Sequence, residues 1–129
     1  MAEAQRAARP LSPHLQVYRP QITMISSILI RITGLGLMAG VLLAVWWLLA
    51  AATSPEYFAT ANAVATSWFG DLVFTGSLWA VWYHYLGGLR HLLWDARRGL
   101  DIETVRLLGM GCIAGSVVLT ALTLIIINL

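Results

Sequence analysis

The chain has 129 residues, of which 59% are hydrophobic and only 11% charged, and its mean hydropathy is +0.76. A typical soluble domain has about 25% charged residues, so this composition argues against a water-soluble enzyme, a disordered chain and a nucleic-acid-binding protein. The single cysteine, Cys112, cannot form an internal disulfide, and no pair of cysteines has the spacing of a metal site. The composition indicates a membrane protein.

Three long uncharged runs, 32–55, 72–89 and 107–129, predict membrane-spanning helices. A helix needs about 20 mostly apolar residues to cross a bilayer, a length that the first and third runs reach. The second run reaches this length if its helix begins near Trp68, with Asp71 in the first turn, where the helix dipole favours an anion. We therefore expect an all-α membrane protein with three transmembrane helices.

In chain order, the expected segments are a cytoplasmic N-terminal tail over 1–21, transmembrane helix I over 22–52, a periplasmic loop over 53–67, transmembrane helix II over 68–95, a cytoplasmic loop over 96–103 and transmembrane helix III over 104–129. The prolines of the tail keep it from forming a continuous helix. The Ser-Pro-Glu sequence at 54–56 ends helix I and favours a new start, because proline is common at the first helical position. The periplasmic loop can therefore hold a short interfacial helix over 57–65.

The arginines predict how the chain is oriented in the membrane. All eight basic residues are arginines, four before residue 32 and four from Arg90 to Arg106, so the 53–67 segment has none. Basic residues favour the cytoplasmic side, which puts the N-terminus and the 96–103 loop inside and the C-terminus outside. The first apolar stretch is longer than the core of a secretory signal and has no convincing cleavage site. We expect uncleaved insertion into a bacterial inner membrane, with a mature organellar protein as the alternative.

His84 lies well inside the apolar part of helix II, where an ionisable group is a functional hypothesis by default. Imidazole is an axial ligand of haem iron, and Gly87 and Gly88 leave room for a flat macrocycle. The alternative is a histidine that hydrogen-bonds a neighbouring helix. His91 shares the face of His84 but lies ~10 Å further along the axis, and His14 is in the tail. A six-coordinate haem would therefore need its second ligand from another chain.

Ser27 and Arg31 form a second candidate site, because their spacing of four residues puts a hydroxyl and a guanidinium on one helix face. Arg31 lies one or two turns into helix I, at a depth where it needs an acceptor. A quinone carbonyl, a haem propionate or a partner carboxylate would each serve. The alternative is an arginine that extends to the lipid phosphates.

Two stretches of the sequence, 9–34 and 84–95, carry a resemblance to a known family. Residues 9–15 read R-P-L-S-P-H-L and residues 27–34 read S-I-L-I-R-I-T-G, similar to the family patterns R-P-L-S-P-H-L and S-x-x-H-R-x-[ST]-G. Residues 84–95 match the pattern H-x-x-x-G-x-R-H-x-x-x-D. Because these motifs occur in the family's order and at the family's separation, the chain resembles the cytochrome b556 membrane-anchor subunits of succinate dehydrogenase, respiratory complex II. One position departs from the pattern: Ile30 stands where the family usually has histidine.

The resemblance implies roles for three residues. His84 would be the axial ligand of haem b, and Ser27 and Arg31 would belong to the ubiquinone pocket, with Arg31 also near the haem propionates. The implied partners are a second small membrane-anchor subunit that supplies the other haem ligand, an iron–sulfur subunit and a flavoprotein subunit. This chain has no dinucleotide fingerprint and no clustered cysteines, so flavin and iron–sulfur clusters belong to those other subunits.

Three alternatives remain from the sequence. The first is the equivalent anchor subunit of a fumarate reductase, an enzyme that runs the succinate/fumarate couple in reverse. A small transporter should carry an acidic residue deep in a helix, and none lies between residues 72 and 89 or after Glu103. A structural anchor without a cofactor would differ from a cytochrome in its reduced-minus-oxidised spectrum.

Overall fold

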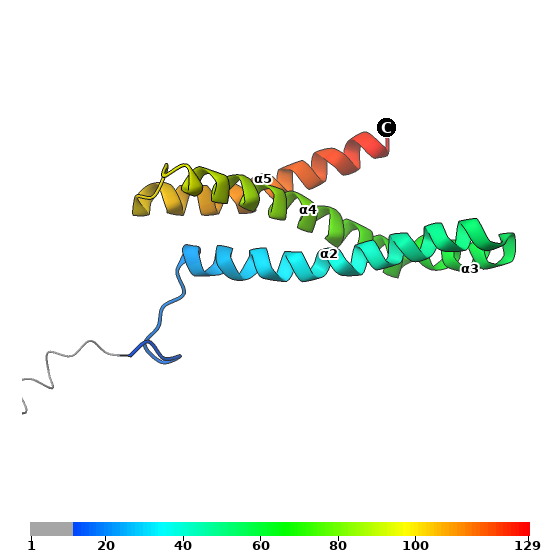
Figure 1. Cartoon of the computed structure of the whole chain (residues 1–129), viewed down its shortest axis with the longest axis horizontal. Coiled ribbons are helices and arrows are strands. Elements are labelled where there is room, and N and C mark those ends of the chain that lie inside the picture. Colours follow the sequence, from blue (N-terminus) through cyan, green and yellow to red (C-terminus); the bar gives the residue numbers. More distant parts are fainter. Residues whose placement is uncertain (1–11) are drawn as a thin grey trace, which may run out of the picture.

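The computed structural model describes residues 12–129; residues 1–11 of the expected tail, which include Arg6 and Arg9, lie outside this range. The described part contains four helices: α2 (Ile22–Thr53), α3 (Pro55–Ala65), α4 (Trp68–Asp95) and α5 (Ile102–Ile127). α2 runs the length of the helical region, α3 turns back at its end, α4 returns beside α2, and α5 turns again (Figure 1). The three long helices are therefore successively antiparallel.

Two serines separate the helices at the turn where α3 lies. Ser54 is in an extended conformation that ends α2, and its hydroxyl accepts a hydrogen bond from the Tyr57 N–H at 3.2 Å. Pro55 occupies the start of α3, where its missing N–H costs no helical hydrogen bond. Ser67 caps α4 in the same way by accepting from the Gly70 N–H. These caps fix the ends of α2, α3 and α4 locally.

The connection from α4 to α5 is held by two residues with positive φ and by a cap. Arg97 and Gly99 have φ values of 56° and 65°, which reverse the chain after α4. Asp101 then caps α5, its carboxylate accepting a hydrogen bond from the Thr104 N–H at 2.9 Å. α5 consequently begins at Ile102, two residues before the start expected for the third helix.

The other helix bounds lie close to the expected segments. α2 extends one residue beyond 22–52, and α4 covers the expected 68–95. The 53–67 segment is not simply a loop, because α3 occupies most of it. α3 begins two residues before the 57–65 helix that the sequence allowed, since the Ser54 cap places proline at its first position.

Length and apolar composition mark two helices of the described chain, α2 and α5, as able to cross a membrane. α4 is 28 residues long, and it carries the polar residues His84, Arg90 and His91. The structure is thus all-helical with two candidate membrane spans.

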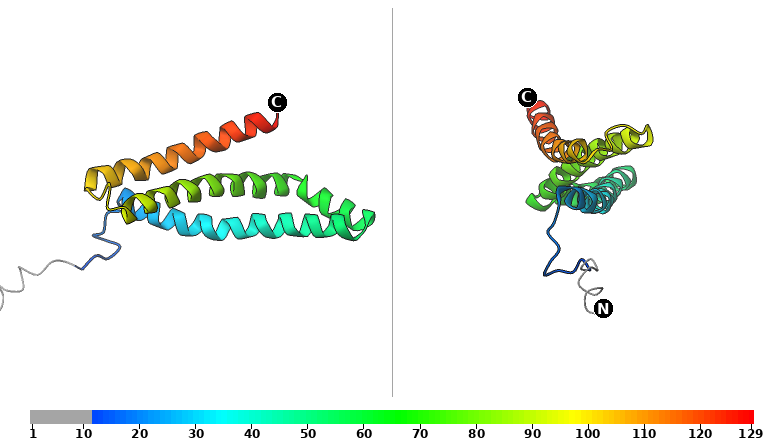
Figure 2. Two further views of the ribbon diagram at one scale, coloured as in Figure 1. Left: turned by 45° about the horizontal axis from the view of Figure 1, so that its top comes forward. Right: turned by 90° about the vertical axis from the view of Figure 1, so that its left-hand side faces the viewer.

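The helices contact one another through small and polar side chains. α4 packs against both α2 and α5, and α5 diverges from its neighbours toward the C-terminus (Figure 2). Fully or nearly buried residues include Ala50, Ala61, Ala80, Ser116 and Thr120. Large apolar side chains such as Leu35, Met38, Leu42 and Ile126 are instead exposed. An apolar exterior around small contact residues is the arrangement that suits helices in lipid.

Candidate functional site

Three contacts define how α2 and α4 are aligned. A Cβ atom added to Gly34 of α2 would lie 3.4 Å from Cε1 of His84 in α4. One turn along α4, Gly87 meets the end of the Ile30 side chain, and one turn further Arg90 donates a hydrogen bond to the Ser26 hydroxyl at 2.9 Å. The contact positions advance along α4 as they recede along α2, as expected for antiparallel helices in one register.

This register brings the predicted site residues to one face. Ser27, Arg31 and Gly34 follow the spacing i, i+4, i+7, so they line one side of α2, and at Gly34 this side comes close to His84. Arg31 and Ser27 lie ~4.5 Å and ~10 Å from Gly34 along the helix axis. Arg31 and His84 are exposed and Ser27 is half-buried. We call this surface, formed by Ser27, Arg31, Gly34, His84 and Gly88, the outer face.

Gly87 and Gly88 have different roles, although the sequence suggested that both leave room for a macrocycle. Gly87 is buried, and any Cβ there would overlap Cδ1 of Ile30. Gly88 lies one turn from His84 on the same side of α4, and a Cβ there would meet nothing within 4 Å. Gly88 alone therefore leaves open space beside the imidazole on the outer face.

The residues of the outer face fit a haem group. The exposed His84 imidazole can donate its nitrogen lone pair to iron, and Gly88 leaves open space beside it. Arg31 on the neighbouring helix carries the positive charge that suits a propionate. Within residues 12–129 there is no group of three or more histidine, cysteine, aspartate or glutamate side chains that could hold a bare metal ion.

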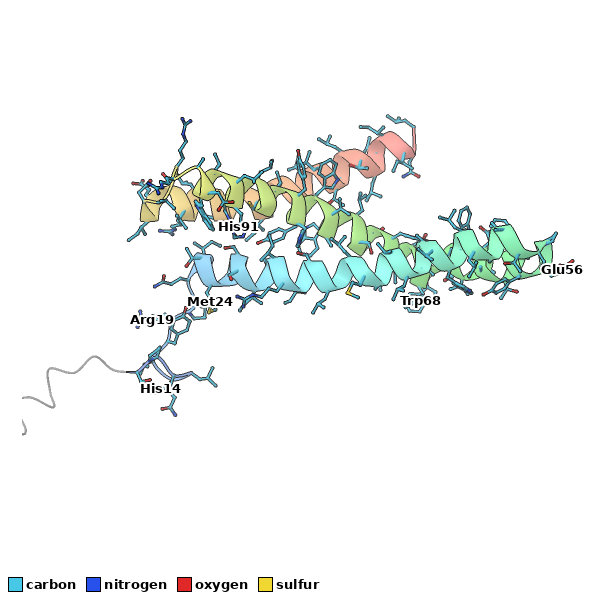
Figure 3. All side chains as sticks on the ribbon, viewed as in Figure 1. His14, Arg19, Met24, Glu56, Trp68 and His91 are labelled. Atoms are coloured by element: carbon cyan, nitrogen blue, oxygen red, sulfur yellow. The ribbon has the colours of Figure 1, made fainter. Side chains whose placement is uncertain are left out.

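The other two histidines do not share the level of His84. His14 lies at the start of a turn in the segment before α2, away from the helices, and His91 lies near the end of α4 (Figure 3). The His91 ring packs edge-on against Trp94, with 5.1 Å between ring centroids. Among the described residues, no second histidine therefore stands opposite His84.

Ile30, at the position where the family usually has histidine, packs against α4. It is half-buried, and its Cδ1 atom fills the space left by Gly87. The substitution therefore gives an apolar contact between α2 and α4.

Sequence reasoning missed a buried polar cluster where α2, α4 and α5 meet. Arg90 is only 4% exposed, although its position in the sequence suggested an arginine at the membrane boundary that mainly sets topology. Its Nη1 donates to the Ser26 hydroxyl, and the Tyr83 hydroxyl donates to the Ser26 carbonyl at 3.1 Å. Gly109 of α5 lies against the guanidinium. We call Ser26, Tyr83, Arg90 and Gly109 the buried junction.

A signal for the junction is present in the sequence but is ambiguous. Tyr83 and Arg90 are seven residues apart, so they share a face of α4, and this face differs from that of His84. Such spacing does not reveal whether another helix covers the face, and α5 provides that cover here.

Comparison with known proteins gives a consistent result. Residues 5–123 match the family model of the succinate dehydrogenase/fumarate reductase transmembrane subunit. The chain belongs to this family. It is 56% identical over 126 residues to the succinate dehydrogenase cytochrome b556 subunit of Paracoccus denitrificans, covering 98% of this chain and 97% of that protein.

More distant relatives carry related names. The cytochrome b556 subunit of Rickettsia conorii is 38% identical over 88% of this chain and 89% of its own length. The succinate dehydrogenase cytochrome b560 subunit of Reclinomonas americana is 38% identical over 78% of this chain and 74% of its own length. The resemblance read from the sequence motifs is therefore confirmed, and the chain is a transmembrane subunit of a respiratory enzyme complex.

Proposed function

We propose that this chain is the membrane anchor of a succinate:ubiquinone oxidoreductase, that it binds haem b through His84, and that Ser27 and Arg31 form part of the quinone-reduction site. The observation that carries the proposal is the close approach of α2 at Gly34 to His84, which brings Ser27, Arg31 and the imidazole to one face. The names of the curated relatives favour succinate dehydrogenase over fumarate reductase.

His84 would hold the haem from this side. A bound haem b supplies a centre that takes up and releases one electron at a time. The His84 imidazole would donate one nitrogen lone pair to the iron, and Gly88 would allow the ring to approach α4 closely. Because His91 lies ~10 Å further along the helix, the second axial ligand would come from a second small membrane subunit.

Ser27 and Arg31 would bind the quinone by hydrogen bonds. The Ser27 hydroxyl and the Arg31 guanidinium can both donate to a quinone carbonyl oxygen. A guanidinium remains positive at any physiological pH, so Arg31 would stabilise the negative charge that develops on that oxygen during reduction. Its planar array of donors would also orient the quinone ring or a haem propionate.

The membrane arrangement completes the proposal. We infer that α4 is a third membrane span between α2 and α5, because it is long enough and packs against both. The arginine pattern favours a cytoplasmic N-terminus in a bacterial inner membrane. Ser27 and Arg31 would then lie near the side on which the iron–sulfur and flavoprotein subunits dock, where electrons and cytoplasmic protons are both available.

The quinone site is tested by Ser27→Ala and Arg31→Leu in the assembled complex. A hydrogen bond to a charged group contributes roughly 1.5–3 kcal/mol, so we expect each variant to lose about tenfold or more of its succinate-to-ubiquinone activity. Arg31→Lys should recover part of the loss, because it keeps the charge without the planar fork.

Succinate oxidation with an artificial acceptor is the control, because it depends on the soluble subunits and should remain unchanged. Normal quinone activity in both variants, with normal assembly, would contradict the assignment of Ser27 and Arg31. A cofactor-free anchor would give no b-type signal in the reduced-minus-oxidised spectrum of the purified wild-type complex.

A further inference from the structure

Arg90 is a buried cation whose described partners are all neutral. Its Nη1 donates to the Ser26 hydroxyl, and its guanidinium carbon lies 4.8 Å from the centre of the Trp94 ring. Its Nε is buried and has no hydrogen-bond partner within residues 12–129. Burying a positive charge among neutral groups has a large free-energy cost, which argues that Arg90 has a specific role at this position.

We propose that Arg90 is a positioning residue for the quinone site: through Ser26 it fixes the register of α2 against α4, and thereby the placement of Ser27 and Arg31 relative to His84. This inference rests on the function proposed above. It assigns Arg90 no contact with quinone or haem, since Arg90 lies in the buried junction and His84 on the outer face.

The register depends on few directional contacts. At Gly34 and Gly87 the two helices meet through a glycine, and van der Waals contacts of this kind have no preferred hydrogen-bond geometry. At Ser26 two donors from α4 converge: Arg90 binds its hydroxyl and Tyr83 binds its carbonyl. The Ser26 hydroxyl also donates to the Thr23 carbonyl, so its orientation is fixed.

A change at Ser26 would be transmitted directly to the next residue. Ser27 follows Ser26 in the chain, and Arg31 lies one turn further along the same rigid helix. A shift of α2 by one residue moves these side chains by ~1.5 Å along the axis and rotates them by ~100° about it. Misplacement of a substrate-binding group by about 1 Å can reduce the rate about 100-fold.

Gly109 allows α5 to close over this contact. A Cβ atom at Gly109 would lie 3.6 Å from Arg90 Nη1 and 3.8 Å from the Ser26 hydroxyl, so the helix backbone is close to both. Covered by α5, the hydrogen bond is shielded from competing donors and acceptors. Buried polar groups of this kind can select one packing arrangement among several even where they add little stability.

The experiment uses the complete complex with Ser26→Ala, Arg90→Lys and Arg90→Met, and with Arg98→Met as the matched control. Arg98 is an exposed arginine just beyond α4, and among the described residues it has no hydrogen bond to Ser26. The measurements are the KM for a short-chain ubiquinone, the midpoint potential and optical spectrum of the haem, artificial-acceptor activity and the amount of assembled complex.

We expect Ser26→Ala and Arg90→Met to raise the quinone KM about tenfold or more and to shift the haem potential, with artificial-acceptor activity unchanged. Ser26→Ala is the more informative variant, because it keeps the Arg90 charge, so a changed potential would report displacement rather than lost charge. Arg90→Lys should fall between wild type and Arg90→Met, and Arg98→Met should match wild type.

The inference is overturned if Ser26→Ala and Arg90→Lys show wild-type KM and haem potential per assembled complex, whether or not the yield falls. These two variants decide the question even if Arg90→Met does not assemble. If Ser27→Ala and Arg31→Leu lose quinone activity while the Ser26 and Arg90 variants do not, only this inference fails. If the Ser27 and Arg31 variants also retain activity, the proposed function fails as well.

Discussion

Ser26 and Ser27 are neighbours in α2, yet they belong to two different regions. Ser26 is 1% exposed and accepts hydrogen bonds from Arg90 and Tyr83 in the buried junction. Ser27 points toward the outer face, where Arg31 and His84 are exposed in the isolated chain. Both regions hold an arginine, but Arg90 is enclosed by three helices and Arg31 is open to an external group.

Residues of the buried junction hold the helices together, whereas residues of the outer face are free to bind a group from outside the chain. In the buried junction every substitution changes contacts within the chain, so helix packing should change first and bound groups only through it. On the outer face few contacts within the chain are lost, so the effect should fall on bound groups. Matched substitutions in the buried junction and on the outer face can therefore test whether the two regions have these different roles.

The largest effect is expected from Gly109→Leu in the buried junction. A Cβ added there would lie 3.6 Å from Arg90 Nη1 and from Ile22 Cγ1, so the three further carbons of leucine would force α5 away. Overpacking of this kind costs about 1–3 kcal/mol or more, and we expect a severe loss of assembled complex in membranes. Gly111→Leu is the control on the same helix, because a Cβ there meets nothing within 4 Å. Equal yields from the two variants would argue against a closely packed junction.

A smaller, selective effect is expected from Gly88→Leu on the outer face. A Cβ at Gly88 meets nothing in this chain, so the helices should pack normally, but the side chain would occupy the space beside His84. The predicted result is a several-fold lower ratio of haem to protein in complex of normal yield. Gly76→Leu is the control, since Gly76 is equally open within the chain and lies two turns from His84 toward the start of α4. Full haem content in Gly88→Leu would contradict the assignment of the haem to the outer face.

The smallest effect is expected at Asp101, outside both regions. Hydrogen bonding by Thr104, through its side chain and its backbone N–H, holds the pKa of the Asp101 carboxyl below its ordinary value. The ionised cap therefore stabilises α5 at pH values above about 4, and this contribution is lost as the pH falls through the lowered pKa. Asp101→Asn should flatten the dependence of Tm on pH in the acid range. An unchanged pH dependence would mean that this cap contributes nothing to the measured stability.

The sequence predicts the helices well because their ends are set by local interactions. Ser54, Ser67 and Asp101 all cap helices through contacts three residues away, and such contacts are legible in the chain itself. The shared face of Ser27 and Arg31 is equally local, because it follows from helical periodicity. That this face adjoins His84 is not local, because it depends on how closely α2 approaches α4 at Gly34.

The buried junction could not be predicted for the same reason. Periodicity identifies residues that share a face of one helix, but it does not state which neighbour covers that face. Arg90 therefore looked like a boundary arginine, and Gly87 looked equivalent to Gly88. In the structure, α2 and α5 pack against α4 so that Arg90 and Gly87 are covered, whereas Gly88 is open.

The central claim is that His84 on the outer face provides one haem ligand. The most direct measurement is the reduced-minus-oxidised spectrum of the purified complex carrying His84→Leu, compared with His91→Leu. His91 lies two turns away on the same helix and packs on Trp94, so it provides a matched loss of one imidazole. We predict that His84→Leu abolishes or alters the low-spin b-type spectrum and that His91→Leu preserves it. An unchanged spectrum in His84→Leu would contradict the claim.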